Sequence, residues 1–519
     1  MLGCLEIYWT DVYKTSHRPM LPKGSTLMNS NFTPRSGKHA PPGIKGVISM
    51  GQQMTIRMMK NDWDVNFFQR PIEEIDQFGK DMTEMLMLDK PFDVSHFKEL
   101  HKLGYLPIEI KSIEEGNFVP YRIPMFTIQN TEPMNGVVVD WLVNYLETIL
   151  SAESWQSPTS ATLGVEYRKL GSKYIKKTNP EMEWFLDYQF HDFSMRGMGG
   201  KSSILNSSMG FAVVTRGSDT LPIIPASRKY YDETEVSINS VIATEHAIMC
   251  SLTGFFLKNK HGNWDKIGEL EVETFRHLLK LFPKGILSIV SDTWDLWRVI
   301  TEYCVILKDE ILAREGKLVI RPDSGNPVDI VCGTALNEKD TILGKYVEYQ
   351  PEEKGVVELL WDIFGGTISS TGYKVLNENI GCIYGDAITL DRATQIFKRL
   401  ESKKFASTNV VLGVGSYSLQ YVTRDTHGFA QKATYIEIDH DGIDIFKDPI
   451  TDSGLKKSAK GLLRVDIVNG EYVLTDCVTP GRAAGGELKT IFKNGHLLNQ
   501  TTLTDIRKRV NEYVESQLN

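Results

Sequence analysis

The sequence lacks the features of a membrane-spanning, secreted or nucleic-acid-binding protein. No run approaches the roughly 18 uninterrupted apolar residues that a membrane-spanning helix needs. The first residues hold no charged segment followed by an apolar stretch, which a signal peptide would show. With 58 Lys and Arg against 66 Asp and Glu, the net charge is −8, which argues against nucleic-acid or anionic-membrane partners but does not exclude a small anionic substrate. We therefore expect a cytoplasmic protein that binds neither nucleic acid nor membrane.

Cysteine is scarce, and its spacing excludes a disulfide framework or a zinc motif. The 6 cysteines stand singly, with no CxxC pair and no histidine at ligand spacing. We expect buried free thiols in a reducing compartment and no metal site made of protein ligands alone. The residues are Cys4, Cys250, Cys304, Cys332, Cys382 and Cys477.

A regular alternation of strand and helix signals runs through the middle of the 519-residue chain, from residue 181 to 420. Apolar runs that alternate with helical stretches predict a parallel sheet covered by helices. Seven such units favour a closed or nearly closed α/β barrel, with its chemistry at the C-terminal strand ends. A doubly wound open sheet is the structural alternative. The runs are 184–190, 211–214, 240–242, 286–290, 318–320, 380–384 and 410–412.

The two ends of the chain have a different pattern. Residues 1–180 mix helical and irregular signals, whereas residues 421–519 show period-2 alternation and an Asn469-Gly470 pair between two apolar runs, which predicts a hairpin. Neither end is regular enough to form a separate domain. The predicted fold is therefore α/β, with an irregular barrel over 181–420 and an α+β domain formed jointly by 1–180 and 421–519.

The predicted strand ends carry carboxylates, cations and glycine turns. Arginine forks and glycine-rich turns suit phosphate groups, and carboxylates accept hydrogen bonds from ribose hydroxyls, so this set suits a phosphorylated sugar. Helix N-caps, surface ion pairs and a structural histidine are the alternatives for the single residues. The residues are Asp219, Asp292, Asp323, Asp386, Arg196, Arg216, Arg321, His246 and the turn Gly413–Ser416.

Eleven short motifs in family order identify a resemblance that covers nearly the whole chain. They are TDVYK at 10–14, HDF at 191–193, RG at 196–197, GSDT at 217–220, EH at 245–246, VSD at 290–292, IRPDSGNP at 320–327, GD at 385–386, TRD at 423–425, FKDP at 446–449 and FKNG at 492–495. With these motifs the chain resembles the nicotinamide phosphoribosyltransferases of the type II phosphoribosyltransferase family. The resemblance implies transfer of a 5-phosphoribosyl group from phosphoribosyl pyrophosphate to nicotinamide. It also implies Mg²⁺ with the diphosphate, ATP as a co-substrate and a homodimer with active sites at its interface.

The resemblance also implies residue roles. Phe193 and Tyr13 would sandwich the pyridine ring, with Tyr13 from the second subunit, and Asp219 would accept from the carboxamide, with Ser288 nearby. The implied catalytic residues are His246, which ATP can phosphorylate, Asp292 and Asp323. The resemblance further implies that Arg196, His246 and Arg321 bind the diphosphate. Asp323, Gly385 and Asp386 would bind the ribose, and Gly415, Ser416 and Arg424 would bind the 5′-phosphate. Lys447 and Lys456 would lie near His246, and Asp11 and Pro322 would contact substrate.

Three other functions remain open at this level. Nicotinate phosphoribosyltransferase activity is the close alternative, although the negative charge of Asp219 would repel the nicotinate carboxylate. A metal-dependent barrel hydrolase or lyase would need clustered ligands that the sequence lacks. A non-catalytic pyridine-nucleotide binder is the third. One departure from the family pattern concerns Gly415-Ser416-Tyr417, where the family turn is richer in glycine, so the bulk of Tyr417 bears on the loop geometry.

Overall fold

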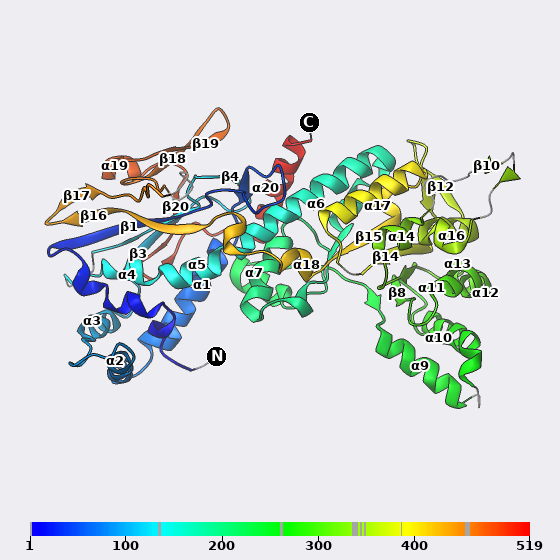
Figure 1. Ribbon diagram of the computed structural model, residues 1–519, viewed down its shortest axis with the longest axis horizontal. Helices are drawn as coiled ribbons and strands as arrows, with labels where there is room; N and C mark the ends of the chain where they lie inside the picture. Colours follow the sequence, from blue (N-terminus) through cyan, green and yellow to red (C-terminus); the bar gives the residue numbers. More distant parts are fainter. Residues whose placement is uncertain are drawn as a thin grey trace.

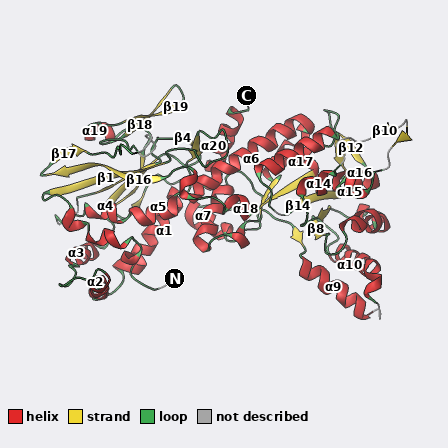
Figure 2. Ribbon diagram, viewed as in Figure 1, coloured by secondary structure: helices red, strands yellow, loops and turns green. Residues whose placement is uncertain are grey.

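The structure contains two separate large sheets joined by helices. It is a computed structural model that describes residues 3–132, 136–259, 263–334, 341–342, 345–346, 349–385, 387–451 and 457–518. Figure 1 shows the antiparallel strands β1, β16 and β17 at one end of the long axis and the parallel strands β8 and β14 at the other. In Figure 2 helices α5 and α7 lie between the two groups of strands.

The parallel sheet has six strands in the order β6-β15-β14-β9-β8-β7. They are β6 (Phe190–Asp192), β15 (Val410–Val414), β14 (Ile380–Tyr384), β9 (Leu318–Arg321), β8 (Leu287–Val290) and β7 (Ile242–Ala243). Two isolated parallel bridges, Asp192 to Ser218 and Gly217 to Asn239, link β6 at one edge to the segment just before β7 at the other. The sheet therefore curls into an irregular α/β barrel, which confirms the predicted fold class.

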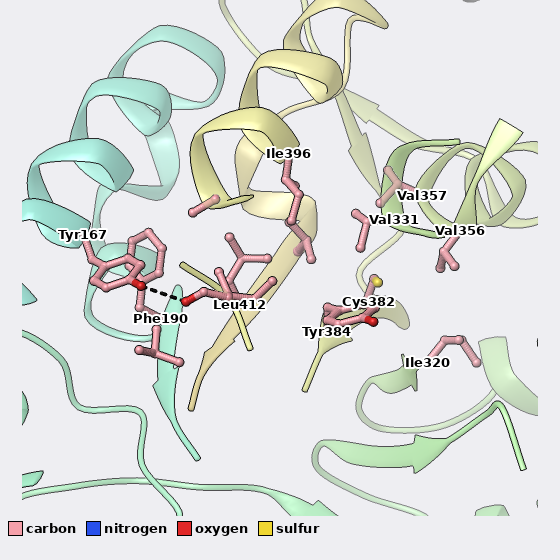
Figure 3. Packing of buried hydrophobic residues seen from close by; sticks show 14 of the residues in the cluster. Tyr167, Phe190, Ile320, Val331, Val356, Val357, Cys382, Tyr384, Ile396 and Leu412 are labelled. Atoms are coloured by element: carbon pink, nitrogen blue, oxygen red, sulfur yellow. Dashed lines mark hydrogen bonds between the residues drawn. The ribbon is translucent and has the colours of Figure 1, made fainter. Parts of the chain in front are cut away.

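Helices cover the parallel sheet because its strands are apolar on both faces. Tyr167 of α6 (Gln156–Thr178) packs its ring 5.1 Å from that of Phe190 on β6, and its hydroxyl donates to the Ile388 carbonyl at 2.7 Å. Ile396 of α17 (Leu390–Ser402) and Leu412 of β15 lie in the same buried cluster (Figure 3). Other covering helices are α7 (Lys201–Phe211), α10 (Ile267–Leu281), α14 (Pro327–Cys332) and α16 (Val356–Phe364).

The antiparallel sheet is built from both ends of the chain, in the order β17-β16-β1-β5-β3-β20-β21. Strand β1 (Ser25–Thr33) pairs with β16 (Ala430–Ile438), some 400 positions later in the sequence. The other strands are β3 (Ile108–Ser112), β5 (Phe126–Asn130), β17 (Asp441–Asp444), β20 (Lys489–Lys493) and β21 (His496–Leu497). Their apolar side chains share a core with α1 (Gln52–Trp63), α2 (Glu74–Met85), α3 (Ser95–Leu103), α4 (Trp141–Tyr145) and α5 (Glu147–Ser154).

Helices from outside residues 181–420 also contribute to the barrel core. Buried side chains of α6 and of α20 (Leu503–Ser516) belong to the cluster around the parallel sheet. The predicted hairpin is confirmed as β18 (Arg464–Val468) and β19 (Glu471–Thr475), joined at Asn469-Gly470, where both turn residues have positive φ. The domain boundaries at residues 180 and 420 stay predictions.

Two of the predicted strands are misplaced in the sequence analysis. Residues 211–214 form the end of α7 and the turn after it, and the strand position of this unit falls at residues 217–218. Most of residues 184–190 lies in a 3₁₀ segment, Pro180–Asp187, and only the last residue begins β6. A short, fully buried apolar run has the same composition in a helix end as in a strand, so composition alone does not separate them.

The cysteines are free thiols, but not all of them are buried as expected. Cys304, Cys332 and Cys382 lie in the barrel core, where burial raises the pKa of the Cys304 and Cys332 thiols to about 12. Cys250 and Cys477 are exposed instead. Among the described residues, no helix combines the length and apolarity needed to cross a membrane.

Candidate active site

The C-terminal ends of the parallel strands carry most of the predicted site residues. Because neighbouring parallel strands end at the same edge of a sheet, these side chains lie around one rim of the barrel. Phe193 follows β6, Asp219 follows the bridged residues 217–218, and His246 begins helix α9 (His246–Asn259) after β7. Asp292, Arg321, Gly385 and Gly415 stand at the ends of β8, β9, β14 and β15.

Asp219 is held as an anionic acceptor. His191 Nε2 lies 3.0 Å from Asp219 Oδ1, and the Ser240 hydroxyl donates to the same oxygen. Burial raises the pKa of Asp219, but the hydrogen bonds from His191 and Ser240 and the positive charge of Arg321 outweigh it, so the pKa lies below its ordinary value. No residue in the described part of the chain donates a hydrogen bond to Oδ2. Asp219 therefore presents one charged oxygen to a ligand.

Phe193 is held beside this carboxylate by close packing. Its ring centroid lies 4.4 Å from that of His191, and the Arg321 guanidinium carbon lies 5.9 Å from the ring centre. A Cβ atom at Gly413 would come within 2.7 Å of the ring, so glycine is required there for the ring to approach β15. A flat aromatic ligand can stack on Phe193 next to an acceptor for its polar substituent.

Three buried polar atoms on or just after β8 and β9 have no hydrogen-bond partner among the described residues, namely Ser288 Oγ, Thr293 Oγ1 and Arg321 Nε. Buried polar atoms are nearly always paired, so such atoms indicate where a ligand or a water supplies the missing partner. Ser288 was predicted near the carboxamide and Arg321 at the diphosphate. Their unpaired atoms agree with positions that a substrate would complete.

Asp292 contacts both His246 and the turn after β9. Its Oδ1 lies 3.3 Å from His246 Nε2, and its Oδ2 accepts from the backbone nitrogen of Asp323 at 2.9 Å and from Ser324 Oγ at 2.5 Å. Arg321, just before Pro322, donates to the Thr244 carbonyl at 3.3 Å. The predicted catalytic residues His246, Asp292 and Asp323 are therefore neighbours.

Gly385 leaves room for this cluster. A Cβ atom there would lie 2.9 Å from Asp323 Oδ1 and 3.3 Å from Arg321 Nε. A side chain at position 385 would push against both groups, so glycine lets Asp323 and Arg321 keep these positions. The backbone of β14 can then come near a ligand held by Arg321 and Asp323.

The predicted phosphate turn packs against the predicted diphosphate turn. Gly415 precedes the short helix α18 (Ser416–Leu419), and Ser416 lies so close to Gly197 that a Cβ atom at Gly197 would fall 1.9 Å from the serine oxygen. Gly197 ends the exposed turn Met195–Gly197 that carries Arg196. Tyr417 is 58% exposed and stacks on Tyr421, with centroids 5.5 Å apart. The bulk of Tyr417 thus lies outside the turn.

Four predicted site residues lie with the antiparallel sheet instead of at the rim. Asp11, Tyr13 and Arg424 line a cavity of about 220 Å³, in which Thr148 donates to Asp11 at 2.8 Å, and Tyr13 is 55% exposed. Lys447 follows β17, at the opposite end of the molecule from β8 and β14 (Figure 1). Within one chain the predicted site residues are thus divided between the rim of the barrel and the antiparallel sheet. Asp386 and Lys456 lie outside the described residues.

Sequence reasoning missed three residues that shape this site. His191 and Asp192 stood inside a recognised motif without a role, and Ser240 was only the start of an apolar run. All three lie next to residues 193 or 219 in the fold. The polar type of Ser240, just before the apolar residues that form β7, was the one available signal.

A curled parallel sheet with cations, carboxylates and glycine turns at one rim defines a barrel enzyme for an anionic sugar substrate. A sequence model of the nicotinate phosphoribosyltransferase (NAPRTase) family matches residues 188–496. The chain is 42% identical to nicotinamide phosphoribosyltransferase of Acinetobacter baylyi, over 98% of this chain and 97% of that protein. It is 30% identical to the enzyme of the same name from Xanthomonas campestris pv. campestris, over 96% of each. The chain belongs to the nicotinate phosphoribosyltransferase family.

Solved structures agree at the level of fold. Human nicotinic acid phosphoribosyltransferase superposes with a TM-score of 0.54 at 13% identity, covering 98% of this chain and 94% of that one. Nicotinate-nucleotide pyrophosphorylase from Pyrococcus furiosus gives the same TM-score and identity, covering 98% and 95%. At this identity the likeness shows a shared architecture of curled barrel and second sheet.

Proposed function

We propose that the protein transfers the 5-phosphoribosyl group of phosphoribosyl pyrophosphate to the ring nitrogen of nicotinamide, giving nicotinamide mononucleotide and pyrophosphate for NAD salvage. The Asp219 carboxylate carries this proposal, because its open oxygen beside the Phe193 ring can accept from an amide N–H. A nicotinate carboxylate at the same place would meet a like charge, which typically costs several kcal/mol. The names of the full-length relatives point to the same substrate.

The rim residues would act mainly by placing charge. Ribosyl transfer passes through an oxocarbenium-like transition state, so stabilising the departing diphosphate matters more than a strong base. Arg196, His246 and Arg321 would hold the diphosphate, and Asp323 with Gly385 and Asp386 would hold the ribose. The backbone of Gly415 and Ser416 would bind the 5′-phosphate. Phe193 orients the pyridine ring toward the ribose carbon.

The carboxylates at the rim fit Mg²⁺ only if the diphosphate supplies further ligands. No three His, Cys, Asp or Glu side chains gather as a metal site within the described ranges. Mg²⁺ typically takes one or two carboxylates and completes its shell with phosphate oxygens and water. Asp292 and Asp323 would supply those carboxylates, and the bound ion would neutralise part of the diphosphate charge.

A second copy of the chain would complete the site. Tyr13 is largely exposed, and Asp11, Tyr13 and Arg424 open into a cavity on the antiparallel half, while the Phe193 rim lies on the barrel half. In an antiparallel homodimer the antiparallel sheet of one subunit would face the barrel rim of the other. Asp11, Tyr13, Arg424 and Lys447 of one subunit would then join the rim of the next. The partner's Tyr13 would close the ring sandwich over Phe193.

We also propose that ATP stimulates the reaction through His246. The imidazole is half-exposed and oriented by Asp292, so a ring nitrogen can accept the γ-phosphoryl group of ATP with release of ADP. Lys447 and Lys456 would neutralise charge near this group. Buried free thiols in the barrel core fit a cytoplasmic location.

Nicotinate transfer is the second candidate, because the family model that matches is named for nicotinate. The test is product analysis with phosphoribosyl pyrophosphate, Mg²⁺ and each pyridine in turn, with and without ATP. We expect faster product formation from nicotinamide and a higher yield with ATP. Faster conversion of nicotinate would contradict the proposed substrate. A rate that does not depend on ATP would contradict the proposed stimulation by ATP.

A further inference from the structure

One buried carboxylate joins the two loops that carry the pyridine-binding residues. Asp192 is the last residue of β6 and is only 1% exposed. Its Oδ1 accepts from the backbone nitrogen of Ser194 at 2.9 Å and from Ser194 Oγ at 2.7 Å. Its Oδ2 accepts from Thr220 Oγ1 at 3.1 Å and from Ser218 Oγ at 3.4 Å. Oδ1 therefore binds the loop that holds Phe193, and Oδ2 binds the loop that holds Asp219.

Asp192 and the residues that donate to it are the chain neighbours of Phe193 and Asp219. Phe193 lies between Asp192 and Ser194, and Asp219 lies between Ser218 and Thr220. The backbone repeats the connection, since Asp219 N donates to the Asp192 carbonyl at 3.0 Å. The Phe193 ring and the Asp219 carboxylate are thus attached to one group.

We propose that Asp192 is a positioning residue for the pyridine substrate. It holds the Phe193 loop at a set distance from the Asp219 loop, so that one molecule can stack on the ring and donate its amide N–H to the carboxylate. Asp192 itself is sealed from the substrate by burial and touches no reacting atom. The inference rests on the proposed function, because it assigns the spacing to a ring that carries an amide.

The physical reason is that a buried carboxylate has a fixed orientation when both of its oxygens accept hydrogen bonds. A buried charge is costly unless it is paired or hydrogen-bonded, and charge-assisted bonds are short and strong. Ser194, Ser218 and Thr220 are each at most 5% exposed, so water does not compete for these bonds. A site whose groups are held before the ligand arrives loses less entropy on binding.

The test compares Asp192→Asn and Thr220→Val with the conservative Thr220→Ser. Thr220→Val removes one donor to Oδ2 and keeps the side-chain volume, whereas Thr220→Ser keeps the hydroxyl. We expect Asp192→Asn and Thr220→Val to weaken nicotinamide binding about tenfold, since the first replaces one acceptor oxygen by an NH₂ donor and the second removes one donor. Thr220→Ser should stay within about twofold. The KM for phosphoribosyl pyrophosphate and kcat should change less than the KM for nicotinamide in every variant.

A buried carboxylate elsewhere provides the control. Glu115 accepts from Gln53 N at 2.6 Å and from the Tyr231 hydroxyl at 2.9 Å, away from the rim. Glu115→Gln should lower Tm without changing nicotinamide affinity. Unchanged nicotinamide affinity in Asp192→Asn and Thr220→Val would overturn the proposal, even if their Tm falls as in Glu115→Gln, and so would equal losses in kcat and in the KM values of both substrates. If Asp192→Asn does not fold, the Thr220 pair decides.

Calorimetric titration with nicotinamide separates this inference from the proposed function, because it needs no turnover. A wild-type protein that binds nicotinamide without ribosyl transfer contradicts the proposed activity, and the binding comparison still decides the role of Asp192. Equal nicotinamide affinity in wild type and both variants contradicts the positioning role even if the wild type is fully active. A wild-type protein that binds no nicotinamide overturns both.

Discussion

His191 Nε2 lies 3.0 Å from Asp219 Oδ1, and Ser240 donates to the same oxygen. Two donors on one carboxylate oxygen set the rotation of the group and keep it anionic. The other oxygen stays available as an acceptor near the Phe193 ring, which packs on His191. We therefore expect the Asp219 charge to discriminate between nicotinamide, which has a neutral amide, and nicotinate, which has a carboxylate.

Replacing Asp219 by Asn should change specificity more than rate. An amide at position 219 no longer repels a carboxylate, so the kcat/KM ratio of nicotinamide to nicotinate should fall about 100-fold. Ser240→Ala is the matched control, because it removes one donor to Asp219 and keeps the charge; its ratio should change far less. Steady-state kinetics with both pyridines measures this. Equal losses on the two substrates in Asp219→Asn would show that the charge does not discriminate.

Two inactive variants should complement each other if the site is shared between subunits. Phe193→Ala disables the barrel rim, and Tyr13→Ala disables the segment contributed to the partner. In a one-to-one mixture after subunit exchange, half of the dimers are mixed and each holds one intact site, so activity should return to about a quarter of wild type. Each variant alone provides the control. A mixture no more active than its components would contradict a site built from two subunits.

Gly197→Ala should disturb the phosphate turn. The new Cβ atom would fall 1.9 Å from Ser416 Oγ, so the two turns must separate. We expect the KM for phosphoribosyl pyrophosphate to rise about tenfold, corresponding to about 1.4 kcal/mol, with the KM for nicotinamide little changed. The double variant Gly197→Ala/Ser416→Gly removes the clash and should recover most of the loss. Failure of the double variant to recover would mean that Gly197 acts in another way.

His246→Ala should abolish stimulation by ATP while basal synthesis stays measurable, although reduced. The reason is that the variant has no imidazole nitrogen to accept a phosphoryl group. His277→Ala is the control, since His277 is an exposed histidine on α10. The measurement is the ratio of rates with and without ATP, together with ³²P transfer to the protein. An unchanged ratio in His246→Ala would exclude this histidine as the phosphoryl acceptor.

Glu271 should make the protein less stable as pH rises. Burial in α10, and to a smaller extent the charge of Asp295, raise the pKa of this carboxyl to about 7, although Tyr303 and Arg298 act in the opposite direction. The folded state then keeps a proton that the unfolded state releases above its ordinary pKa. Stability is therefore lost between about pH 4.5 and 7 and stays reduced above that, on the order of 2 kcal/mol.

Thermal denaturation of Glu271→Gln at pH 5 and pH 8 tests this. The variant should match wild type near pH 5 and have a Tm a few degrees higher at pH 8, because glutamine has no charge to bury. Glu269→Gln, at an exposed position of the same helix, should show no such difference. A gain of equal size at both pH values would point to packing instead of ionisation.

The sequence predicts the barrel well because its strands are apolar on both faces and its polar residues follow them directly. That pattern located five of the seven strand positions and most of the rim residues. It misplaced the strand at 211–214, since a buried helix end has the same composition. The pattern also could not show that Phe193 lies at the barrel rim and Tyr13 beside the antiparallel sheet, because the order of motifs in a sequence does not give the distances between them.

The sequence by itself determined the class of the protein and the joint origin of the second domain from both chain ends, and it predicted which motifs bind the substrates. Those properties depend on residue types and on their order. Only the tertiary structure decided that β1 pairs with β16, that His191 and Ser240 donate to one oxygen of Asp219, and that Asp192 connects the Phe193 and Asp219 loops. These contacts join residues far apart in the chain, and which oxygen a donor reaches depends on side-chain geometry that the folded packing alone sets.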